Sequence, residues 1–298
     1  MKQLLLILTI LFALASCKTT GPDTSLSNVN QDNSQEMKFD HKAKVRSFIS
    51  VVNATDTATG KSLVNPEYIQ HNPFIPTGRA SFINLFPVLQ KYGTQAETQR
   101  MLHDGNYVVM HNHWKNADPF GANQMASFDV LRFDENGLII EHWDALMPMG
   151  TANVSGRTLL DGPKEVTDFD QTEANKAKVA ALFAILEKGN PEEIVTALPK
   201  YFTPDYHQHN PNAGDGIEGF AKAVQSGDLN FSITKQHKVL GEGNFVVSIS
   251  EGIHNGSPAV FYDLLRLEEG MIVEHWDIIQ DIPTENLANS NTMFGFSS

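Results

Sequence analysis

Apolar side chains recur three to four residues apart in two stretches of the chain, a spacing typical of amphipathic helices. The first stripe, within residues 40–53, consists of Ala43, Val45, Phe48, Ile49 and Val52. The second stripe consists of Val179, Leu182, Phe183 and Leu186. Lys188-Gly189-Asn190-Pro191 ends the second helix, and Pro191 at a first helical position predicts a further helix to Tyr201. A later helix is expected in each half, near residues 79–92 and 216–226.

The remainder of each half reads as strands joined by tight turns. The first long strands are expected over residues 95–103 and 231–240. The turn signals are Asp104-Gly105-Asn106, Glu135-Asn136-Gly137, Glu242-Gly243-Asn244 and Glu269-Gly270. Helices followed by a meander of strands predict an α+β domain, in which N-terminal helices pack on one face of a curved antiparallel sheet.

The two halves are copies of each other. Glu-His-Trp-Asp occurs at residues 141–144 and 274–277, and Tyr-x-Gln-His-Asn-Pro occurs at residues 68–73 and 206–211. An offset of more than 130 residues indicates domain duplication, since solenoid repeats are far shorter. We therefore expect two tandem domains. Their bounds are residues 39–149 and 171–285, with a linker at 150–170 and a C-terminal tail at 286–298.

Composition and charge fit two ordinary globular cores. Hydrophobic residues make up 41% of the 298 residues and charged residues 19%, which is enough apolar material for two domains. The formal net charge is -13. This charge disfavours binding of nucleic acid, because phosphate contacts require basic patches.

The first 17 residues are predicted to be a signal peptide. Lys2 provides a short basic region, and Leu4–Leu14 form an apolar stretch that is too short to span a membrane. Leu14-Ala15-Ser16-Cys17 resembles a bacterial lipobox, which implies lipidation of Cys17, the only cysteine in the chain. A plain secretory signal with an incidental cysteine is the alternative. Residues 18–38 suit a disordered tether, because they are mostly polar.

The lipobox resemblance implies a location in the bacterial cell envelope. The protein would be anchored to the membrane through lipid on Cys17. It would lie on the outer membrane facing the periplasm, or on the cell surface.

Three motifs in each copy resemble the SnoaL-like branch of the NTF2-like superfamily. In the first copy they are Tyr68-Ile69-Gln70-His71-Asn72-Pro73, Asp129-Val130-Leu131-Arg132, and Gly137 followed by Glu141-His142-Trp143-Asp144. The resemblance implies two cone-shaped α+β domains, each with a mostly apolar pocket between sheet and helices. Characterised members of the family include polyketide cyclases that catalyse an intramolecular aldol condensation without metal or cofactor. Other members are isomerases, dehydratases or hydrolases.

Aldol chemistry needs a base beside a carbonyl group and a donor for the enolate oxygen. Asp129 lies next to the apolar Val130 and Leu131, so its carboxyl group is expected to be buried and therefore used or paired. The resemblance places the catalytic aspartate on Asp129, with Asp144 as the other candidate and Asp263 as the copy of Asp129. A structural ion pair with an arginine is the alternative for Asp129.

His111 and His113 lie two residues apart on an expected strand and thus share one face. If that face lines the pocket, the two histidines are candidates for the acid or for an orienting partner. The second copy has Ile249 and Glu251 at these positions, so the chemistry of the two copies would differ. An exposed polar face is the alternative.

Further histidines accompany the loop and the last strand. His71 and His209 precede Asn-Pro in a loop that the resemblance places near the pocket mouth, although a structural turn is equally consistent. On the last strand, Trp143 and its copy Trp276 are expected to pack in the core or in an interface, because of their large aromatic rings. The residues on the other face could reach a pocket; they are His142 and Asp144 with their copies His275 and Asp277.

No metal and no cofactor is predicted. Gly105 and the histidines at 111 and 113 match half of a cupin metal motif, but the glutamate expected after them is missing. The expected partner is a small, mostly apolar organic molecule. The two copies are expected to form a pseudo-symmetric dimer within one chain, monomeric once the lipid is removed.

Two functions fit this sequence. One is cofactor-independent acid–base catalysis of aldol, isomerase or hydrolase type. The alternative is a non-catalytic envelope lipoprotein that binds a small ligand or serves as a scaffold.

Overall fold

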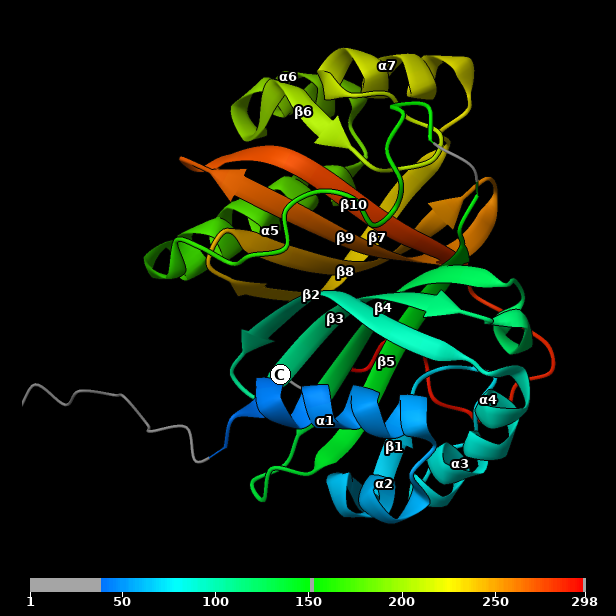
Figure 1. Cartoon of the computed structure of the whole chain (residues 1–298). Helices are drawn as coiled ribbons and strands as arrows, with labels where there is room; N and C mark the ends of the chain where they lie inside the picture. Colours follow the sequence, from blue (N-terminus) through cyan, green and yellow to red (C-terminus); the bar gives the residue numbers. More distant parts are fainter. Residues whose placement is uncertain (1–38, 151–152, 297–298) are drawn as a thin grey trace, which may run out of the picture. The chain divides into compact units, whose positions relative to one another are not determined.

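The computed structural model describes residues 39–150 and 153–296 (Figure 1). The predicted signal peptide, the tether and Cys17 therefore lie outside the described residues. The first domain contains α1 (His41–Ala54), α2 (Thr57–Leu63), β1 (Val64–Gln70), α3 (Arg79–Asn84), α4 (Phe86–Tyr92), β2 (Gln95–Asp104), β3 (Tyr107–Lys115), the 3-10 turn η1 (Asp118–Phe120), β4 (Gln124–Phe133) and β5 (Ile139–Pro148).

The second domain repeats this order with small differences. It contains η2 (Phe169–Gln171), α5 (Thr172–Lys188), α6 (Pro191–Tyr201), β6 (Phe202–Gln208), α7 (Gly216–Ser226), β7 (Phe231–Glu242), β8 (Phe245–His254), β9 (Ser257–Glu268) and β10 (Met271–Asp281). The helix expected from Pro191 to Tyr201 is present as α6. In the first domain the later helix is broken into α3 and α4, while in the second it is the single helix α7. Among the described residues, no helix has the length and apolar character needed to cross a membrane.

Each domain has a five-stranded sheet, in the orders β1-β5-β4-β3-β2 and β6-β10-β9-β8-β7. The expectation of a purely antiparallel sheet is wrong at one edge, because β1 pairs parallel with β5 and β6 pairs parallel with β10. Pro66 and Pro204 argue against strands there, since proline cannot donate to a ladder. An edge strand tolerates proline, so both segments can pair on one side only.

The helical stripes pack as expected. Val45, Phe48, Val51 and Val52 of α1 are buried, as are Val179, Leu182 and Phe183 of α5. Each stripe belongs to a separate apolar cluster between the helices and one face of its own sheet. The helices therefore cover one face of each sheet and leave the opposite face for another partner (Figure 1).

The opposite faces of the two sheets pack against each other. One continuous apolar cluster takes buried residues from both sheets, including Trp143 and Trp276, which are fully buried. Phe128 on β4 stacks on Tyr262 on β9 with the ring centroids 6.1 Å apart. This is the pseudo-dimer within one chain that the duplication predicts, and the described residues of both domains belong to one compact unit.

The segments that follow the two sheets are exchanged between the domains. Residues 153–161, here called the linker arm, follow the first domain and bind the second, where Ser155 Oγ donates to Gln208 O at 2.8 Å. Residues 289–296, here called the C-terminal arm, follow the second domain and bind the first, where Asn291 Nδ2 donates to Gln70 O at 2.8 Å. Each domain is thus held by a segment that follows the other.

A buried glutamate fastens each arm contact. Glu274, 1% exposed, accepts from Arg266 Nε at 2.9 Å and lies 2.9 Å from His209 Nε2. The other ring nitrogen of His209 lies 2.6 Å from Thr158 O on the linker arm. Burial acts to raise the pKa of Glu274, but the hydrogen bonds from His209 and Arg266 hold it below its usual value. Glu141, Arg132 and His71 repeat this arrangement in the first domain.

Replacing Glu274 with Gln is expected to lower the free energy of unfolding by about 3 kcal/mol, because it removes the buried negative charge that pairs with Arg266. Urea unfolding followed by circular dichroism measures the change. The matched control is Glu218→Gln, which breaks the exposed pair with Lys222 on α7 and should leave the unfolding midpoint unchanged. Equal midpoints for both variants would argue against a stabilising role for Glu274.

Candidate functional site

The first domain encloses a cavity of about 740 Å³ between its helices and sheet. This volume falls within the range of sites for small organic molecules. Most of the wall is apolar and comes from α1, α3, α4, η1 and the sheet, including Phe48, Val52, Phe82, Leu89, Met110 and Trp114. At the mouth, residues of the second domain also contribute, among them His254 and Asp281.

Three titratable side chains meet in the wall of this cavity. Asp129 on β4 and Asp144 on β5 are directly paired across the strands, so both side chains point to the same face. His142, two residues before Asp144, shares that face. His142 Nε2 lies 3.0 Å from Asp129 Oδ1 and 3.9 Å from Asp144 Oδ2. All three residues are less than 10% exposed.

Polar neighbours hold both carboxylates in place. Asn112 Nδ2 donates to Asp129 Oδ2 at 2.8 Å, and Ser127 Oγ donates to the same oxygen at 2.5 Å. Asn72 Nδ2 donates to both oxygens of Asp144, at 2.9 and 3.1 Å. Sequence patterns gave Asn72 only a turn role and did not single out Asn112 or Ser127. Alternation from Asp129 along β4 was the signal that could have found Ser127.

Side chains of β1 form hydrogen bonds beside this cluster. Gln70 Nε2 donates to Tyr68 Oη at 3.1 Å and lies 3.1 Å from His142 Nδ1, while Gln70 Oε1 accepts from Asn72 N. The hydroxyl of Tyr68 therefore receives a hydrogen bond and keeps its own proton for another acceptor. Tyr68 and Gln70 both line the cavity.

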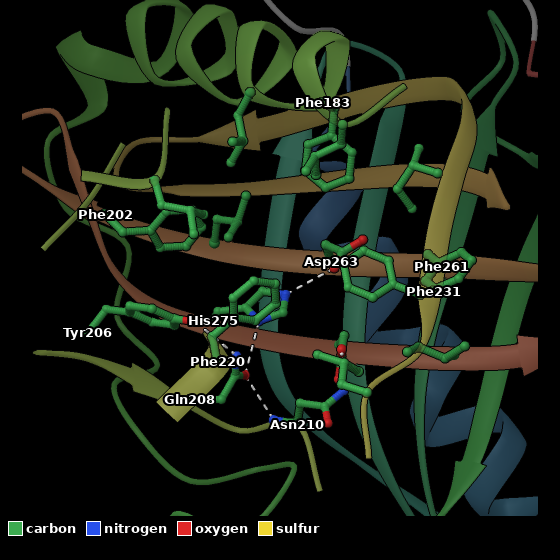
Figure 2. A pocket seen from close by; sticks show the side chains of 18 residues that line it. Phe183, Phe202, Tyr206, Gln208, Asn210, Phe220, Phe231, Phe261, Asp263 and His275 are labelled. Atoms are coloured by element: carbon green, nitrogen blue, oxygen red, sulfur yellow. Dashed lines mark hydrogen bonds and ion pairs between the residues drawn. The ribbon is translucent and has the colours of Figure 1, made fainter. Parts of the chain in front are cut away.

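The second domain has the same cluster in a much smaller cavity, of about 80 Å³ (Figure 2). His275 Nε2 lies 2.9 Å from Asp263 Oδ1, and Asn210 Nδ2 donates to Asp277 Oδ2 at 2.7 Å. Figure 2 shows aromatic rings of Phe183, Phe231 and Phe261 gathered around this polar cluster. A cavity of this size has no room for a substrate of ordinary size.

Different side chains on two strands account for part of the smaller cavity in the second domain. In the first domain Trp114 Nε1 donates to Ser127 Oγ at 2.9 Å. At the repeated positions the second domain has Gly252 and Phe261. A Cβ atom on Gly252 would lie 3.0 Å from the ring of Phe261 and 2.0 Å from Ser232 O. Residue 252 is therefore restricted to glycine mainly by the carbonyl group of Ser232, and the ring of Phe261 packs beside it without a side chain in the way.

Two carboxylate oxygens of the second cluster have no partner within the part of the chain that the structure describes. Among the described residues, Asp263 Oδ2 and Asp277 Oδ1 are buried and have no hydrogen-bond partner. Ser250 and Phe261 stand where Asn112 and Ser127 supply donors in the first domain. The second cluster thus keeps its titratable groups and the asparagine that donates to Asp277, but it lacks the two donors that hold Asp129 in the first domain.

His111 and His113 are not part of either cluster. Their strand face is opposite to the one that carries Met110 and Trp114, so the expectation that they accompany Asp129 in the pocket is wrong. His111 is buried between the domains, stacked on Phe128 at 4.4 Å and 3.1 Å from Arg100 Nη1. Burial, together with the charge of Arg100, lowers the pKa of His111 well below its usual value. His113 contacts Gln124 and is partly exposed.

His71 and His209 also point away from the pockets, which corrects their expected place at the pocket mouth. Their rings stack on Trp143 and Trp276 at 4.7 and 4.6 Å on the face between the domains. They follow strands rather than helices, and each is held between a glutamate and an arm carbonyl. Trp143 packs in the core as expected, and His142 and Asp144 lie on the opposite face of β5, toward the cavity.

The comparison with protein families agrees with this architecture. The model of the SnoaL-like domain matches residues 45–142 and again 179–275, more than half of the chain. The chain belongs to the SnoaL-like family. Its two matched segments are the two domains described above. None of the curated proteins matches the chain.

Solved structures similar to this SnoaL-like chain each align with little more than one third of it. IdmH from Streptomyces antibioticus, a proposed polyketide cyclase, is 18% identical, with a TM-score of 0.32, over 36% of this chain and 92% of its own. A steroid delta-isomerase from Pseudomonas aeruginosa is 18% identical, with a TM-score of 0.31, over 36% and 80%. An NTF2-like protein of unknown function from Cytophaga hutchinsonii is 17% identical, with a TM-score of 0.32, over 38% and 95%.

Burial and neighbouring charges shift the pKa values of the cluster in the first SnoaL-like domain. Burial raises the pKa of Asp144 to about 6; the charge of Asp129 adds to this rise, and His142 and Asn72 oppose it. Burial alone would lower the pKa of His142, but the hydrogen bond to Asp129 and the charges of both aspartates raise it. Burial, followed by the charges of Asp144 and Asp129, raises the pKa of Tyr68. Asp144 can therefore exchange a proton near neutral pH.

The same clusters have the residue types that bind metal ions. Two groups within the described ranges have ligand atoms close enough to hold an ion, Asp129 with His142 and Asp144, and Asp263 with His275 and Asp277. In the first group every carboxylate oxygen already accepts a hydrogen bond, and both nitrogens of His142 face polar neighbours. An ion there would have to displace these contacts. The two histidines of the cupin half-motif belong to neither group.

The Asp144→Asn variant tests the raised pKa. Above about pH 6 the native protein must ionise buried Asp144, which ionises near pH 4 in the unfolded chain, so this group destabilises the fold as the pH rises from about 4 to 6. Asparagine cannot ionise. The melting temperature of the variant, relative to the parent, should therefore rise with pH and level off above about pH 6, as measured by differential scanning calorimetry.

Asp134→Asn is the control for this experiment. Burial acts to raise the pKa of Asp134, but hydrogen bonds from Leu138 N, Asn65 and Asn136 N lower it. Its stabilising effect is complete above about pH 4, so the difference from the parent should stay constant between pH 5 and 8. A constant difference for Asp144→Asn as well would contradict the raised pKa.

Proposed function

We propose that the first domain binds a small, mostly apolar carbonyl compound and catalyses proton transfer on it without a cofactor. The observation that carries this proposal is the buried Asp129–His142–Asp144 cluster in the wall of a cavity of about 740 Å³. Apolar walls select an apolar substrate, and a few convergent polar groups fix its orientation. Membership of the SnoaL-like family supports the same class of chemistry.

The geometry favours Asp144 as the base. Asp129 already accepts hydrogen bonds from three side chains, those of Asn112, Ser127 and His142. Asp144 accepts from Asn72 alone, and its pKa of about 6 is close to neutral pH. Asp144 would take the proton from the carbon next to the carbonyl group. Asp129 would keep His142 oriented.

Tyr68 is the donor for the enolate oxygen in this proposal. Its hydroxyl lines the cavity, accepts from Gln70 and has a proton to give. Negative charge that develops on the carbonyl oxygen would receive this hydrogen bond. Proton loss to Asp144 and hydrogen bonding by Tyr68 together form an enolate, the common intermediate of aldol and isomerase reactions.

Exchange of carbon-bound hydrogen for deuterium tests this chemistry. With 2-tetralone as the probe in deuterated buffer, the parent protein should accelerate deuteration beside the carbonyl group, measured by proton NMR. Asp144→Asn should reduce the acceleration by about 100-fold or more, the usual contribution of a general base. The matched control, Asp277→Asn, changes the repeated residue in the filled pocket and should have no effect. Full activity of Asp144→Asn would contradict the assignment.

Non-catalytic binding is the second candidate function. The observation in its favour is the second domain, which keeps the same Asp–His–Asp cluster in a cavity of about 80 Å³. The cluster therefore has a use in the fold that does not depend on a substrate. Saturable binding of 2-tetralone by the parent without any acceleration of deuterium exchange would favour this function over catalysis.

We also propose that the protein is attached to the bacterial envelope by lipid on Cys17. The lipobox-like Leu14-Ala15-Ser16-Cys17 after an apolar stretch supports the attachment. During expression in a bacterium with labelled palmitate, the parent should incorporate label and partition with membranes. Cys17→Ala should do neither. Release of an unlabelled parent protein in soluble form would instead indicate a plain secretory signal.

A further inference from the structure

The C-terminal arm, although it follows the second domain, binds the loop that carries Asn72 in the first. Asn289 Nδ2 donates to Asn72 O at 2.8 Å and to Ile75 O at 2.7 Å. Asn291 Nδ2 donates to Gln70 O at 2.8 Å. Ala288 N, just before the arm, donates to Pro73 O at 2.7 Å. Backbone carbonyls along this loop are thus fixed from outside the domain.

Side-chain contacts reinforce this attachment. His71 Nδ1 lies 2.6 Å from Thr292 O, while its other ring nitrogen faces Glu141. Trp143 Nε1 donates to Phe294 O at 3.2 Å, and its ring stacks on Phe296 at 4.3 Å. The arm is therefore built into the contact between the domains.

The same loop holds the cluster from its inner side. While the carbonyl groups of Gln70 and Asn72 face the arm, the side chain of Gln70 reaches His142 and that of Asn72 reaches both oxygens of Asp144. The arm and the cluster thus contact opposite sides of a segment only three residues long. A displacement of the backbone at Asn72 would move the donor that Asp144 depends on.

The second domain provides an internal comparison. There the linker arm makes the equivalent contacts, from Asn153 Nδ2 to His209 O and from Ser155 Oγ to Gln208 O. The linker arm joins the two domains and is fixed at both ends. The C-terminal arm follows the last strand of the second domain and is held on the first domain by the hydrogen bonds of Asn289 and Asn291. These contacts can therefore be removed without changing the segment that connects the two domains.

We propose that Asn289 and Asn291 of the C-terminal arm are positioning residues for the acid–base cluster of the first domain. They hold the backbone of Gln70–Asn72 so that the side chain of Asn72 stays on Asp144. The effect of Asn289 and Asn291 on catalysis rests on the proposed function above. Their effect on the position of Asn72 does not depend on a substrate. The second domain thus completes the site of the first.

The protonation of Asp144 reports directly on this contact. The hydrogen bond from Asn72 holds the pKa of Asp144 down against burial, so its loss should raise that pKa further. Substitutions at Asn289 and Asn291 replace none of the other titratable groups near Asp144. These groups are Asp129, His142 and Tyr68 in the cavity wall, His71 and Tyr262 on the face between the domains, and His254 and Asp281 of the second domain in the cavity lining. The helices contribute only apolar side chains to this cavity.

The experiment follows the carboxyl carbon of Asp144 by NMR during a pH titration. Aspartate labelled with carbon-13 at the carboxyl group is incorporated into the full chain, and the Asp144→Asn spectrum assigns the signal. In Asn289→Ala/Asn291→Ala the midpoint should move upward by about 1 pH unit, the scale of one lost hydrogen bond to a carboxylate. The single variant Asn291→Ala should move it in the same direction by less.

The matched control is Asn153→Ala/Ser155→Ala, which removes the equivalent contacts from the second domain. It should leave the midpoint of Asp144 unchanged, although its melting temperature should fall by a similar amount. An unchanged midpoint in both arm variants would overturn the proposal. So would an equal shift in the linker-arm control, because it would indicate a general loss of stability.

Deuterium exchange of 2-tetralone then separates the two proposals. If the site is catalytic, the pH profile of exchange should shift with the NMR midpoint in the arm variants. A shifted NMR midpoint without any exchange in the parent would overturn the proposed catalysis but support the positioning role. Exchange in the parent with an unshifted NMR midpoint in the arm variants would support the proposed catalysis but overturn the positioning role.

Discussion

The buried glutamate at the start of each Glu-His-Trp-Asp motif is the constraint on which the arrangement of the two domains depends. Glu141 and Glu274 lie between the sheets, where an unpaired charge would be strongly destabilising. Each receives an arginine from the neighbouring strand and a histidine from the loop after the first strand. The second nitrogen of that histidine needs an acceptor, and the exchanged arm supplies it. One buried charge thus links the strand, the loop and the other domain.

Strand alternation places the candidate site on the opposite side of the same motif. Since consecutive side chains of a strand point to opposite faces, Glu141 and Trp143 face the other domain while His142 and Asp144 face the cavity. The motif therefore contributes to the contact between the domains through one face and to the candidate site through the other. It also explains why Asn72 and His71, adjacent in the chain, contact different clusters. The loop is held from the domain interface and in turn holds the site.

Much of this could be predicted from the sequence, and what could not has a physical reason. Helical stripes and turn signals sufficed for the α+β class, because these follow from local periodicity. The repeated motifs sufficed for the duplication and for a dimer of the two copies within one chain. His111 and His113 were misplaced because periodicity assigns residues to a shared face without telling which face is covered. The parallel edge strands were missed because each contains a proline, which argues against a strand. Proline is excluded from central strands only, so an edge strand can contain it. The arms were missed because their contacts are between distant segments and leave no pattern.

The differences between the copies account for one open pocket and one filled pocket. Trp114 and Ser127 leave space above Asp129 and supply it with a donor, whereas Gly252 and Phe261 place a ring in the equivalent space and remove the donor. The second cluster retains two buried carboxylate oxygens without partners, a costly state that no ligand relieves in a cavity this small. Asp263 on β9 and His275 and Asp277 on β10 are nevertheless present in the second domain, where the surface between the sheets and the linker arm match those of the first. The two domains therefore share one interface while only one of them has space for a small molecule.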